Sequence, residues 1–291
     1  MKKKLFALSA LVLATAFMAI ACSAPAPIPS ASPSVEAAQS SESAQPSGAA
    51  VSAEASAASP AAQLTVSAAA SLTDVMKEIA EAYKEQAPDV SVTFNFGASG
   101  TLQQQIEQGA PADVFVSAAA KQMDALESKG MILKDSRVDL LENKLVLVIP
   151  ADKDEPADFE SLADAGQLAI GDPASVPAGQ YAEQALTQMG IYDELNSGNK
   201  IVLGSDVRAV LNWVETGNAD AGIVYATDAL TSDKVKIAAT APSGSHDPVI
   251  YPAAVLDGSA NAEAAQAFLD FLSTPDISAL FEKYGFTALK K

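Results

Sequence analysis

From Leu64 onward, short apolar segments alternate with amphipathic ones, and this alternation constrains the fold more than any other feature of the chain. Apolar residues at every second position predict strands, whereas apolar residues three and four positions apart predict helices. The expected strands of the first set are 64–68, 90–96 and 113–117, and the helices that follow them are 72–86, 101–108 and 119–129. Strands that alternate with helices favour a mostly parallel sheet flanked by helices.

The alternation then starts again and predicts a second unit of about the same size. Its expected strands are 144–149, 168–170, 201–203 and 221–225, with helices at 178–189 and 205–215. A strand at 249–256 and helices at 262–272 and 275–284 follow. We therefore expect two α/β lobes with a cleft between them and two crossing strands, near 144–149 and 249–256, as the hinge. The expected limits are 63–143 plus 251–291 for lobe 1 and 144–250 for lobe 2.

The N-terminus has the pattern of an export signal. Lysines at positions 2–4 precede the apolar segment 5–20, which is too short and wrongly flanked for a typical membrane-spanning helix. The run Ala19-Ile20-Ala21-Cys22 resembles a bacterial lipobox, in which the cysteine is lipidated and begins the mature chain. Cys22 is the only cysteine of the chain, and its alternative role is that of a buried free thiol. We expect removal of a signal peptide at 1–21 and an extracytoplasmic lipoprotein, anchored to the periplasmic or outer face of a membrane.

A long segment without apolar periodicity follows the cysteine. Residues 23–62 consist almost entirely of Ala, Ser and Pro, with scattered Gln and three Glu. Such a composition cannot bury enough apolar surface to offset the entropy cost of ordering the chain. Residues 22–62 are therefore expected to form a lipidated and disordered tether that keeps the folded part near the membrane.

The charge of the chain excludes some classes of partner. It has 36 acidic and 18 basic residues, a formal net charge of −18. Nucleic acids and anionic membrane surfaces are bound by basic patches, so neither is an expected partner. Only two arginines are present, Arg137 and Arg208, so a bound anion would have little guanidinium chemistry available.

Hydrogen-bond donors recur where the expected strands give way to helices. Ser71 and Ser99 lie at two such junctions, and the N–H groups of Ala178 and Val207 lie in the first turns of two later helices. Tyr225 ends the strand 221–225. Ser71 by itself could simply cap its own helix, because serine is a preferred capping residue. Ligands of open α/β sheets bind outside the carboxyl ends of the strands, so donors from both lobes are expected to converge there.

Such a donor set suits a small, fully ionised oxyanion. Hydroxyls, N–H groups and helix N-termini can satisfy every oxygen of the anion without a formal cation. Repulsion by distant carboxylates is screened over about 10 Å at 0.1 M salt, whereas these dipoles act at contact. A protonated oxyanion would need an acceptor as well. Asp74 and Asp206 could serve, but both are expected in first turns of helices, where a carboxylate favours a capping or dipole role.

Six segments in order carry a family resemblance. They are Ala-Ala-Ala-Ser-Leu (68–72), Gly-Ala-Pro-Ala-Asp-Val-Phe (109–115), Gly-Asp-Pro-Ala-Ser-Val-Pro-Ala-Gly (171–179), Asp-Val-Arg (206–208), Gly-Ile-Val-Tyr (222–225) and Tyr-Gly-Phe-Thr (284–287). Over 64–291 the chain resembles the periplasmic molybdate-binding proteins of ABC transporters. This resemblance implies a two-lobed periplasmic-binding-protein fold of type II. It also implies capture of molybdate or tungstate and delivery of the anion to a membrane permease.

The resemblance also implies a ligand set. The hydroxyls would be those of Ser71, Ser99 and Tyr225, and the backbone N–H groups those of Ser99, Ala178 and Val207. Gly100 stands where some members of the family have another serine. The implied protein is a monomer without a cofactor and without a bound free metal cation, since the metal arrives within the oxyanion.

Two alternatives stay open at this point. Another tetrahedral oxyanion such as sulfate could be the ligand, because cleft dimensions are not visible in a sequence. A serine-dependent enzyme would need a base beside Ser71 or Ser99, and the only histidine, His246, lies in a loop far along the chain. Cysteine and histidine clusters that could hold a metal are absent from the sequence.

Four further residues have competing interpretations. Asp113 is expected to anchor a strand by hydrogen bonds, and Arg208 to form an interlobe or surface ion pair; for both, direct contact with the anion is the alternative. Trp213 is expected to pack in the core. Tyr251, on the second crossing strand, is a candidate for lining the hinge.

Overall fold

The structure is a computed structural model that describes residues 62–289. The predicted signal peptide 1–21, the lipid-attachment residue Cys22 and the tether up to residue 61 lie outside the described residues. Ala62, the last residue of the predicted tether, is the first residue of a strand.

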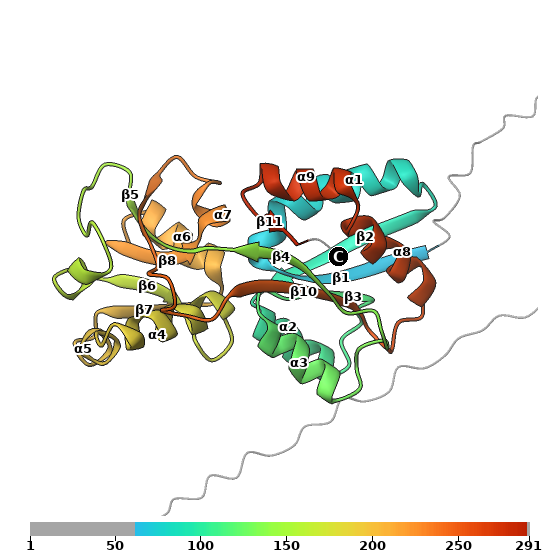
Figure 1. Ribbon diagram of the computed structural model, residues 1–291, viewed down its shortest axis with the longest axis horizontal. Helices are drawn as coiled ribbons and strands as arrows, with labels where there is room; N and C mark the ends of the chain where they lie inside the picture. Colours follow the sequence, from blue (N-terminus) through green and yellow to red (C-terminus); the bar gives the residue numbers. More distant parts are fainter. Residues whose placement is uncertain (1–61, 290–291) are drawn as a thin grey trace, which may run out of the picture. The chain divides into compact units, whose positions relative to one another are not determined.

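The first lobe is built on a six-stranded sheet with the order β11-β4-β10-β3-β1-β2. Its strands are β1 (Ala62–Ala69), β2 (Val90–Gly97), β3 (Val114–Val116), β4 (Val138–Asn143), β10 (Val249–Val255) and β11 (Thr287–Ala288). The helices around it are η1 (Ala70–Leu72), α1 (Thr73–Gln86), α2 (Ser99–Glu107), α3 (Ala120–Ser128), α8 (Ala262–Leu272) and α9 (Pro275–Lys283). Helices α2 and α3 cover one face of the sheet, and α1, α8 and α9 cover the other (Figure 1).

The second lobe is built on a five-stranded sheet with the order β7-β6-β8-β5-β9. Its strands are β5 (Leu145–Pro150), β6 (Leu168–Gly171), β7 (Ile201–Gly204), β8 (Ala221–Tyr225) and β9 (Val235–Thr240). Its helices are η2 (Glu160–Ala163), α4 (Pro177–Gln188), α5 (Tyr192–Ser197), α6 (Val207–Glu215) and α7 (Ala226–Ala229). Helices α4 and α5 lie on one side of this sheet, and α6 and α7 on the other (Figure 1).

The apolar pattern of the sequence explains which positions are buried. Strand β5 reads Leu-Val-Leu-Val-Ile before its proline, and all five apolar residues are buried because the strand lies between β8 and β9. Helix α6 buries residues spaced three, four and seven positions apart: Val207, Val210, Leu211 and Val214. That spacing places them on one face of a helix. Trp213 is partly buried and packs against the same core, as expected.

The predicted mixed α/β fold with two helix-flanked sheets is confirmed, but the sheets are mixed rather than mostly parallel in their pairings. Strands β2, β1 and β3 pair parallel, and so do β7, β6 and β8. The strands nearest the connection between the lobes, β4, β10, β5 and β9, pair antiparallel with their neighbours. Parallel neighbours require a crossover connection, usually through a helix. Where the chain passes directly from one lobe to the other, no crossover helix is present, so the strands next to the connection pair antiparallel.

The position of the crossings also corrects the prediction. Strand β5, expected to be a crossing strand, lies wholly in the second sheet, and β10 lies wholly in the first. The chain crosses instead between β4 and β5, at Asn143 to Leu145, and again in the segment 241–248 between β9 and β10. Strands β4 and β9 were not predicted, because their exposed polar residues interrupt the apolar pattern. The exact lobe limits, 63–143 plus 251–291 and 144–250, stay a prediction.

Candidate anion-binding site

A small cavity with an empty volume of about 210 Å³ lies between the two lobes. Its lining from the first lobe consists of Ala69, Ala70, Ser71, Gly97, Ala98, Ser99 and Ala118. Its lining from the second lobe consists of Val176, Pro177, Ala178, Asp206, Val207 and Tyr225. The structure therefore brings all five residues that the sequence singled out to one cavity. Each of the five is at most 4% exposed.

The topology explains this convergence. Ser71 follows the carboxyl end of β1 by two residues, and Ser99 follows that of β2 by two residues. Ala178 and Val207 stand in the first turns of the helices that follow β6 and β7, and Tyr225 is the last residue of β8. All five thus lie at the carboxyl ends of parallel strands, where open α/β sheets bind ligands.

The three hydroxyls of the cavity differ in their partners. Ser71 Oγ lies 2.9 Å from the hydroxyl of Tyr251. Ser99 Oγ accepts a hydrogen bond of 3.0 Å from the N–H of Ala118. The Tyr225 hydroxyl is buried and has no hydrogen-bond partner among the described residues. Because an unpaired buried hydroxyl is costly, this group is a candidate to bind a ligand in the cavity.

Three helix N-termini also meet at the cavity. Ser99 begins α2, Ala178 is the second residue of α4 and Val207 begins α6. The first N–H groups of a helix have no partner within the helix and carry the positive end of its dipole. Neither α2 nor α4 has a side-chain cap. Asp206 caps α6 through a 2.9 Å hydrogen bond from the N–H of Ala209, as expected for a carboxylate before a first turn.

The two lobes touch each other beside the cavity. The N–H of Gly100 in α2 donates a 2.9 Å hydrogen bond to the carbonyl oxygen of Ser175 in the other lobe. A Cβ atom at Gly100 would lie 2.5 Å from that oxygen, which is closer than two such atoms can approach. The amide of Gln122 in α3 donates to Gln180 in α4 at 3.3 Å. The absence of a side chain at Gly100 therefore lets the backbones of the two lobes meet.

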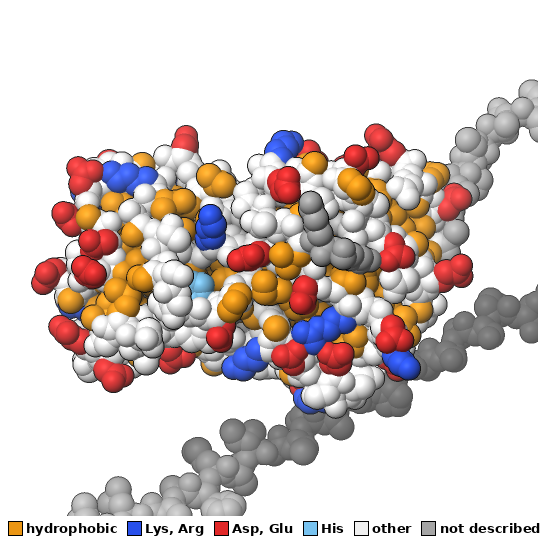
Figure 2. Space-filling model, viewed as in Figure 1, with side chains coloured by type: hydrophobic (Ala, Val, Ile, Leu, Met, Phe, Trp, Pro, Cys, Tyr) orange, Lys and Arg blue, Asp and Glu red, His pale blue; other side chains and the backbone are white. Residues whose placement is uncertain are grey.

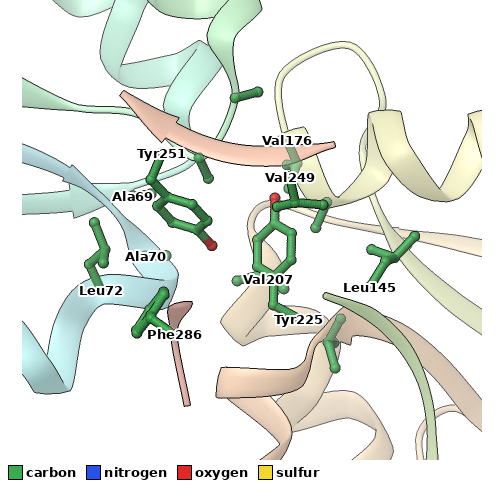
Figure 3. Packing of buried hydrophobic residues seen from close by; sticks show 14 of the residues in the cluster. Ala69, Ala70, Leu72, Leu145, Val176, Val207, Tyr225, Val249, Tyr251 and Phe286 are labelled. Carbon is green, nitrogen blue, oxygen red and sulfur yellow. The ribbon is translucent and has the colours of Figure 1, made fainter. Parts of the chain in front are cut away.

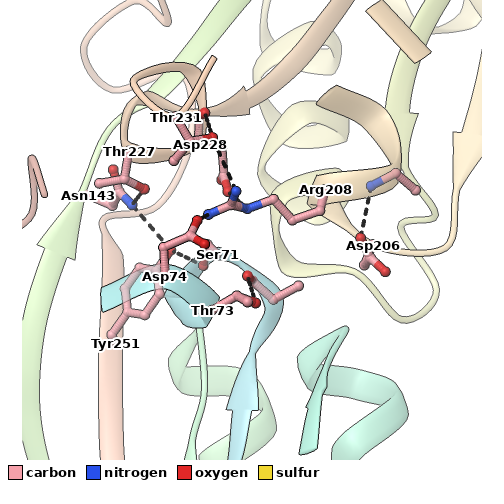
Figure 4. A network of polar contacts seen from close by, with 12 residues as sticks. Ser71, Thr73, Asp74, Asn143, Asp206, Arg208, Thr227, Asp228, Thr231 and Tyr251 are labelled. Carbon is pink, nitrogen blue, oxygen red and sulfur yellow. Dashed lines mark hydrogen bonds and ion pairs between the residues drawn. The ribbon is translucent and has the colours of Figure 1, made fainter. Parts of the chain in front are cut away.

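Arg208 points away from the cavity and into a network between the lobes (Figure 4). Its Nη2 lies 2.8 Å from Asp74 Oδ2 in helix α1 of the first lobe. Its Nη1 donates to Thr231 Oγ1 at 3.1 Å. Its Nε lies 2.6 Å from Asp228 Oδ1, an ion pair without the angle of a hydrogen bond. Of the two predicted roles, the structure shows the interlobe ion pair.

Burial changes the ionisation of the groups around the cavity. It raises the pKa of the Tyr225 hydroxyl well above its usual value, and it does the same to the pKa of Tyr251. Both tyrosines therefore keep their hydrogens at neutral pH. Burial also raises the pKa of the Asp228 carboxyl to about 7, although the positive charge of Arg208 acts in the opposite direction.

Tyr251, Asn143 and Thr227 form a polar cluster behind the cavity whose role the sequence did not predict. Asn143 Nδ2 lies 2.9 Å from Thr227 Oγ1 and 3.2 Å from the Tyr251 hydroxyl. A register shift in β10 occurs at Tyr251 and Pro252, because proline has no N–H for the ladder. Figure 3 shows the ring of Tyr251 opposite that of Tyr225, and the ring centroids are 5.8 Å apart. The tyrosine of the hinge was noticed in the sequence, but no signal pointed to its neighbours.

Two other singled-out residues lie away from the cavity. Asp113 accepts hydrogen bonds from the N–H of Thr65 at 2.7 Å and from the hydroxyl of Ser259 at 2.6 Å, so it anchors strands as expected. His246 borders a separate surface pocket, and its Nδ1 lies 2.6 Å from the backbone oxygen of Asp247. Neither serine of the cavity has this histidine as a partner.

The surface agrees with the strongly acidic composition. On the face shown in Figure 2, acidic side chains are spread widely and basic side chains occur singly or in small groups. Within residues 62–289, no group of three or more His, Cys, Asp or Glu side chains is placed to hold a metal ion. No helix in this part of the chain is long and apolar enough to cross a membrane.

Comparison with known proteins identifies the family. A family described as bacterial extracellular solute-binding protein matches residues 64–287. The molybdate-binding protein ModA of Escherichia coli is 44% identical over 232 residues, which cover 77% of this chain and 89% of ModA. ModA of Haemophilus influenzae is 42% identical over 234 residues, which cover 78% of this chain and 91% of that protein.

A solved structure gives the same result. The periplasmic molybdate-binding protein of Azotobacter vinelandii superposes with a TM-score of 0.70 at 26% identity, covering 78% of this chain and all of that one. The predicted resemblance to molybdate-binding proteins of ABC transporters is thus confirmed, and so is the periplasmic-binding-protein fold. The relatives are solute-binding proteins rather than enzymes, so the alternative of a serine-dependent enzyme is wrong. The chain belongs to the bacterial extracellular solute-binding protein family.

Proposed function

We propose that this protein captures molybdate or tungstate between its two lobes, outside the cytoplasm, and delivers the anion to the membrane permease of an ABC importer. The observation that carries the proposal is the cavity lined by donors from both lobes, among them the unpartnered hydroxyl of Tyr225. ModA proteins that are 42% and 44% identical to the chain support molybdate as the ligand. The anion is cargo, and no cofactor takes part.

The proposed ligands are the hydroxyls of Ser71, Ser99 and Tyr225 and the N–H groups of Ser99, Ala178 and Val207. A tetrahedral dianion has only acceptor oxygens, so a set made only of donors matches its chemistry. The N-termini of α2, α4 and α6 add the positive ends of three helix dipoles. These dipoles act at contact distance, where the negative charge of the distant surface is screened.

Binding of the anion would favour the closed arrangement of the lobes. Each lobe contributes only part of the donor set, so the anion is fully hydrogen-bonded only when both lobes reach it. A ligand shifts an equilibrium by its difference in affinity for the two states. Hinge closure about the two crossings, at 143–145 and 241–248, is the motion that this architecture provides.

The N-terminal segment supplies the attachment to the membrane. We propose that residues 1–21 are removed, that Cys22 is lipidated, and that the tether up to residue 61 lets a monomer move between the medium and its permease. A tether of about 40 residues has a root-mean-square span of roughly 35 Å if it behaves as a flexible chain. The protein would thus stay within reach of its membrane partner.

Titration calorimetry of the purified mature protein with molybdate, tungstate, sulfate and phosphate tests the proposed ligand. We expect heats of binding at one site per chain for molybdate and tungstate, and weaker binding of sulfate because it is a smaller anion. Tighter binding of sulfate than of molybdate would contradict the proposal. It would assign the site to the other tetrahedral oxyanion that the sequence left open.

A further inference from the structure

Behind the cavity, four buried polar side chains form one hydrogen-bonded chain across the hinge (Figure 4). Ser71 of η1 contacts Tyr251 of β10, Tyr251 contacts Asn143 of β4, and Asn143 contacts Thr227 of α7. The four residues are at most 6% exposed, so water does not compete for these bonds. Only Ser71 lines the cavity. The other three can affect a ligand only through Ser71 or through the packing.

The direction of this chain is set at Asn143. Its Oδ1 accepts a 2.8 Å hydrogen bond from the backbone N–H of Lys144. A flipped amide would place its NH₂ group against that N–H, donor against donor, so the orientation of the amide is determined by its surroundings. The NH₂ group therefore faces Thr227 Oγ1 at 2.9 Å and the Tyr251 hydroxyl at 3.2 Å, and both of its hydrogens are used.

This orientation decides which way the next bond runs. Either hydroxyl of the 2.9 Å pair between Tyr251 and Ser71 can be the donor. Because Tyr251 already accepts a hydrogen from Asn143, donation of its own hydrogen to Ser71 Oγ is the arrangement that uses every group. Burial raises the pKa of Tyr251 well above its usual value, so that hydrogen stays in place at neutral pH. Edge contacts with the rings of Phe286 and Tyr225, at centroid distances of 5.5 and 5.8 Å, hold the tyrosine ring in position.

Ser71 therefore receives a hydrogen bond and keeps its own hydrogen for the cavity. Ser99 Oγ accepts from the N–H of Ala118, and the Tyr225 hydroxyl has no partner among the described residues. Asp206 Oδ1 is engaged as the cap of α6. Ser71 and Ser99 thus keep their hydrogens for the ligand, whereas the Tyr225 hydroxyl is free both to donate and to accept.

We propose that Asn143 and Tyr251 are positioning residues that orient the Ser71 hydroxyl as a hydrogen donor toward the bound anion. This inference rests on the proposed function, because it concerns the same cavity. Molybdate, tungstate and sulfate dianions only accept hydrogen bonds. Hydrogen phosphate carries an O–H group, which would find no acceptor at an oriented Ser71 hydroxyl.

A double-mutant cycle tests the positioning role. We expect Ser71→Ala and Tyr251→Phe each to weaken molybdate binding about tenfold in calorimetry, and the double variant to be no weaker than Ser71→Ala alone. Tyr251 would then act through Ser71. If the two losses of affinity multiply, to about a hundredfold in the double variant, the inference is wrong. Tyr251 would then act through packing, independently of Ser71. Tyr83→Phe is the matched control, since Tyr83 is buried in α1 and does not line the cavity.

Asn143→Asp tests the direction of the chain. An aspartate has two acceptor oxygens, so the Tyr251 hydroxyl would turn its hydrogen toward residue 143 and would accept one from Ser71. Ser71 would then present a lone pair to the cavity. At about pH 8, molybdate and hydrogen phosphate are both dianions, so the added negative charge weakens both to a similar degree. We expect the ratio of phosphate affinity to molybdate affinity to rise at least about tenfold, and an unchanged ratio would contradict the proposed direction.

The outcomes for wild-type protein separate the two proposals. If the wild type binds neither molybdate nor tungstate, the proposed function is wrong and the inference falls with it. If the wild type binds molybdate but the cycle is additive and the ratio is unchanged, only the positioning role is wrong. Circular dichroism and thermal unfolding of each variant establish that it folds. The Tyr251→Phe cycle decides the matter if Asn143→Asp does not fold.

Discussion

At the scale of single residues, binding depends on which hydrogen-bond donors and acceptors of the cavity are already used within the protein. Around the cavity, Ser99 accepts a hydrogen bond from Ala118, Ser71 shares one with Tyr251, and Tyr225 has no hydrogen-bond partner among the described residues. A side chain buried without a partner lowers the stability of the ligand-free protein, and it becomes useful only when a ligand arrives. Tyr225 is therefore the residue at which stability and binding should oppose each other.

Replacement of Tyr225 by phenylalanine separates these two effects. We expect Tyr225→Phe to weaken molybdate binding about tenfold to a hundredfold, because one donor to the anion is lost. The free energy of unfolding of the ligand-free protein should stay the same or rise by about 1 kcal/mol, since an unpaired polar atom is removed. Calorimetry and urea unfolding measure the two quantities. A variant that loses stability but keeps its affinity would show that the hydroxyl serves the fold instead of the ligand.

The carboxyl of Asp228 should make stability depend on pH. Its pKa is raised by burial to about 7 from the model-compound value of 3.8, in an environment formed by Arg208, the backbone of Tyr225 and the charge of Asp206. Between these two values the folded protein binds the proton more tightly than the unfolded chain does, so the free energy of unfolding falls as the pH rises. That contribution disappears in Asp228→Asn. Relative to the wild type, the variant should gain about 1 to 3 kcal/mol between pH 5 and pH 8.

Urea unfolding of the ligand-free wild type and of Asp228→Asn at the two pH values measures this difference. At pH 5 the wild-type carboxyl is protonated, and only at pH 8 is it charged beside Arg208, so the change with pH isolates the ionisation of the carboxyl. A difference between variant and wild type that is constant from pH 5 to pH 8 would contradict the assigned cause.

At the scale of elements, the site depends on how closely helices approach strands. Helix α4 runs so near to β6 that a Cβ atom at Gly179 would lie 1.9 Å from the carbonyl oxygen of Gly171. This contact sets the height at which the N-terminus of α4, with the N–H of Ala178, stands above the sheet. The Gly-Asp-Pro-Ala-Ser-Val-Pro-Ala-Gly segment of the sequence is therefore a close-packed turn as well as a source of donors.

Gly179→Ala should push helix α4 away from its strand. We expect a loss of about 1 to 3 kcal/mol in the free energy of unfolding, the usual cost of forcing atoms into a packed interior. Gly258→Ala is the matched control, because no atom lies within 4 Å of the added Cβ and its φ is not positive. Urea unfolding of both variants measures the effect. Equal stability of the two would mean that α4 has room to move.

At the scale of the whole molecule, function depends on contacts that exist only while the lobes are together. The bond from Gly100 N–H to the Ser175 oxygen and the ion pair from Arg208 to Asp74 both join the first lobe to the second. The ion pair is partly exposed, so it contributes at most about 1 kcal/mol. The backbone contact also leaves no room for a side chain at Gly100, so a substitution there tests closure of the lobes more directly.

Gly100→Val should interfere with closure without touching the proposed ligands. A Cβ atom at this position would lie 2.5 Å from the Ser175 oxygen, so the lobes would have to stay further apart. We expect about tenfold weaker molybdate binding. We also expect a smaller decrease in radius of gyration on ligand addition, measured by small-angle X-ray scattering. Thr101→Val, at the exposed next position of α2, is the control of similar size. Wild-type affinity and compaction in Gly100→Val would contradict the closure mechanism.

The predicted attachment to the membrane is tested on the intact exported chain. Mass spectrometry of the mature protein should find Cys22 as the first residue with a covalent lipid, and the protein should fractionate with membranes. Cys22→Ser should be released from the membrane while its molybdate affinity stays unchanged, since the residue lies outside the described residues and is none of the proposed ligands. A mature chain that still carries residues 1–21 without a lipid would contradict the prediction.

The sequence by itself determined the two-lobed α/β fold, the family, and the five residues that meet at the cavity. The fold follows from apolar periodicity, which sets strands and helices, and the convergence of the donors follows from the ends of parallel strands at one edge of a sheet. The family was inferred from the resemblance of six short segments to known sequences. The sequence misplaced the crossing strands and missed β4 and β9, whose exposed polar residues disturb the period.

Only the tertiary structure decided what each donor has left to offer. Ser71 is joined to Tyr251 across 180 positions of the chain, and Arg208 to Asp74 across 134, so neither pairing leaves a local signal. The direction of the bonds from Asn143 through Tyr251 to Ser71 depends on which atoms lie within 3.2 Å in three dimensions. Residue types determine which groups can donate, but only the surrounding contacts determine which hydrogens remain free for an anion.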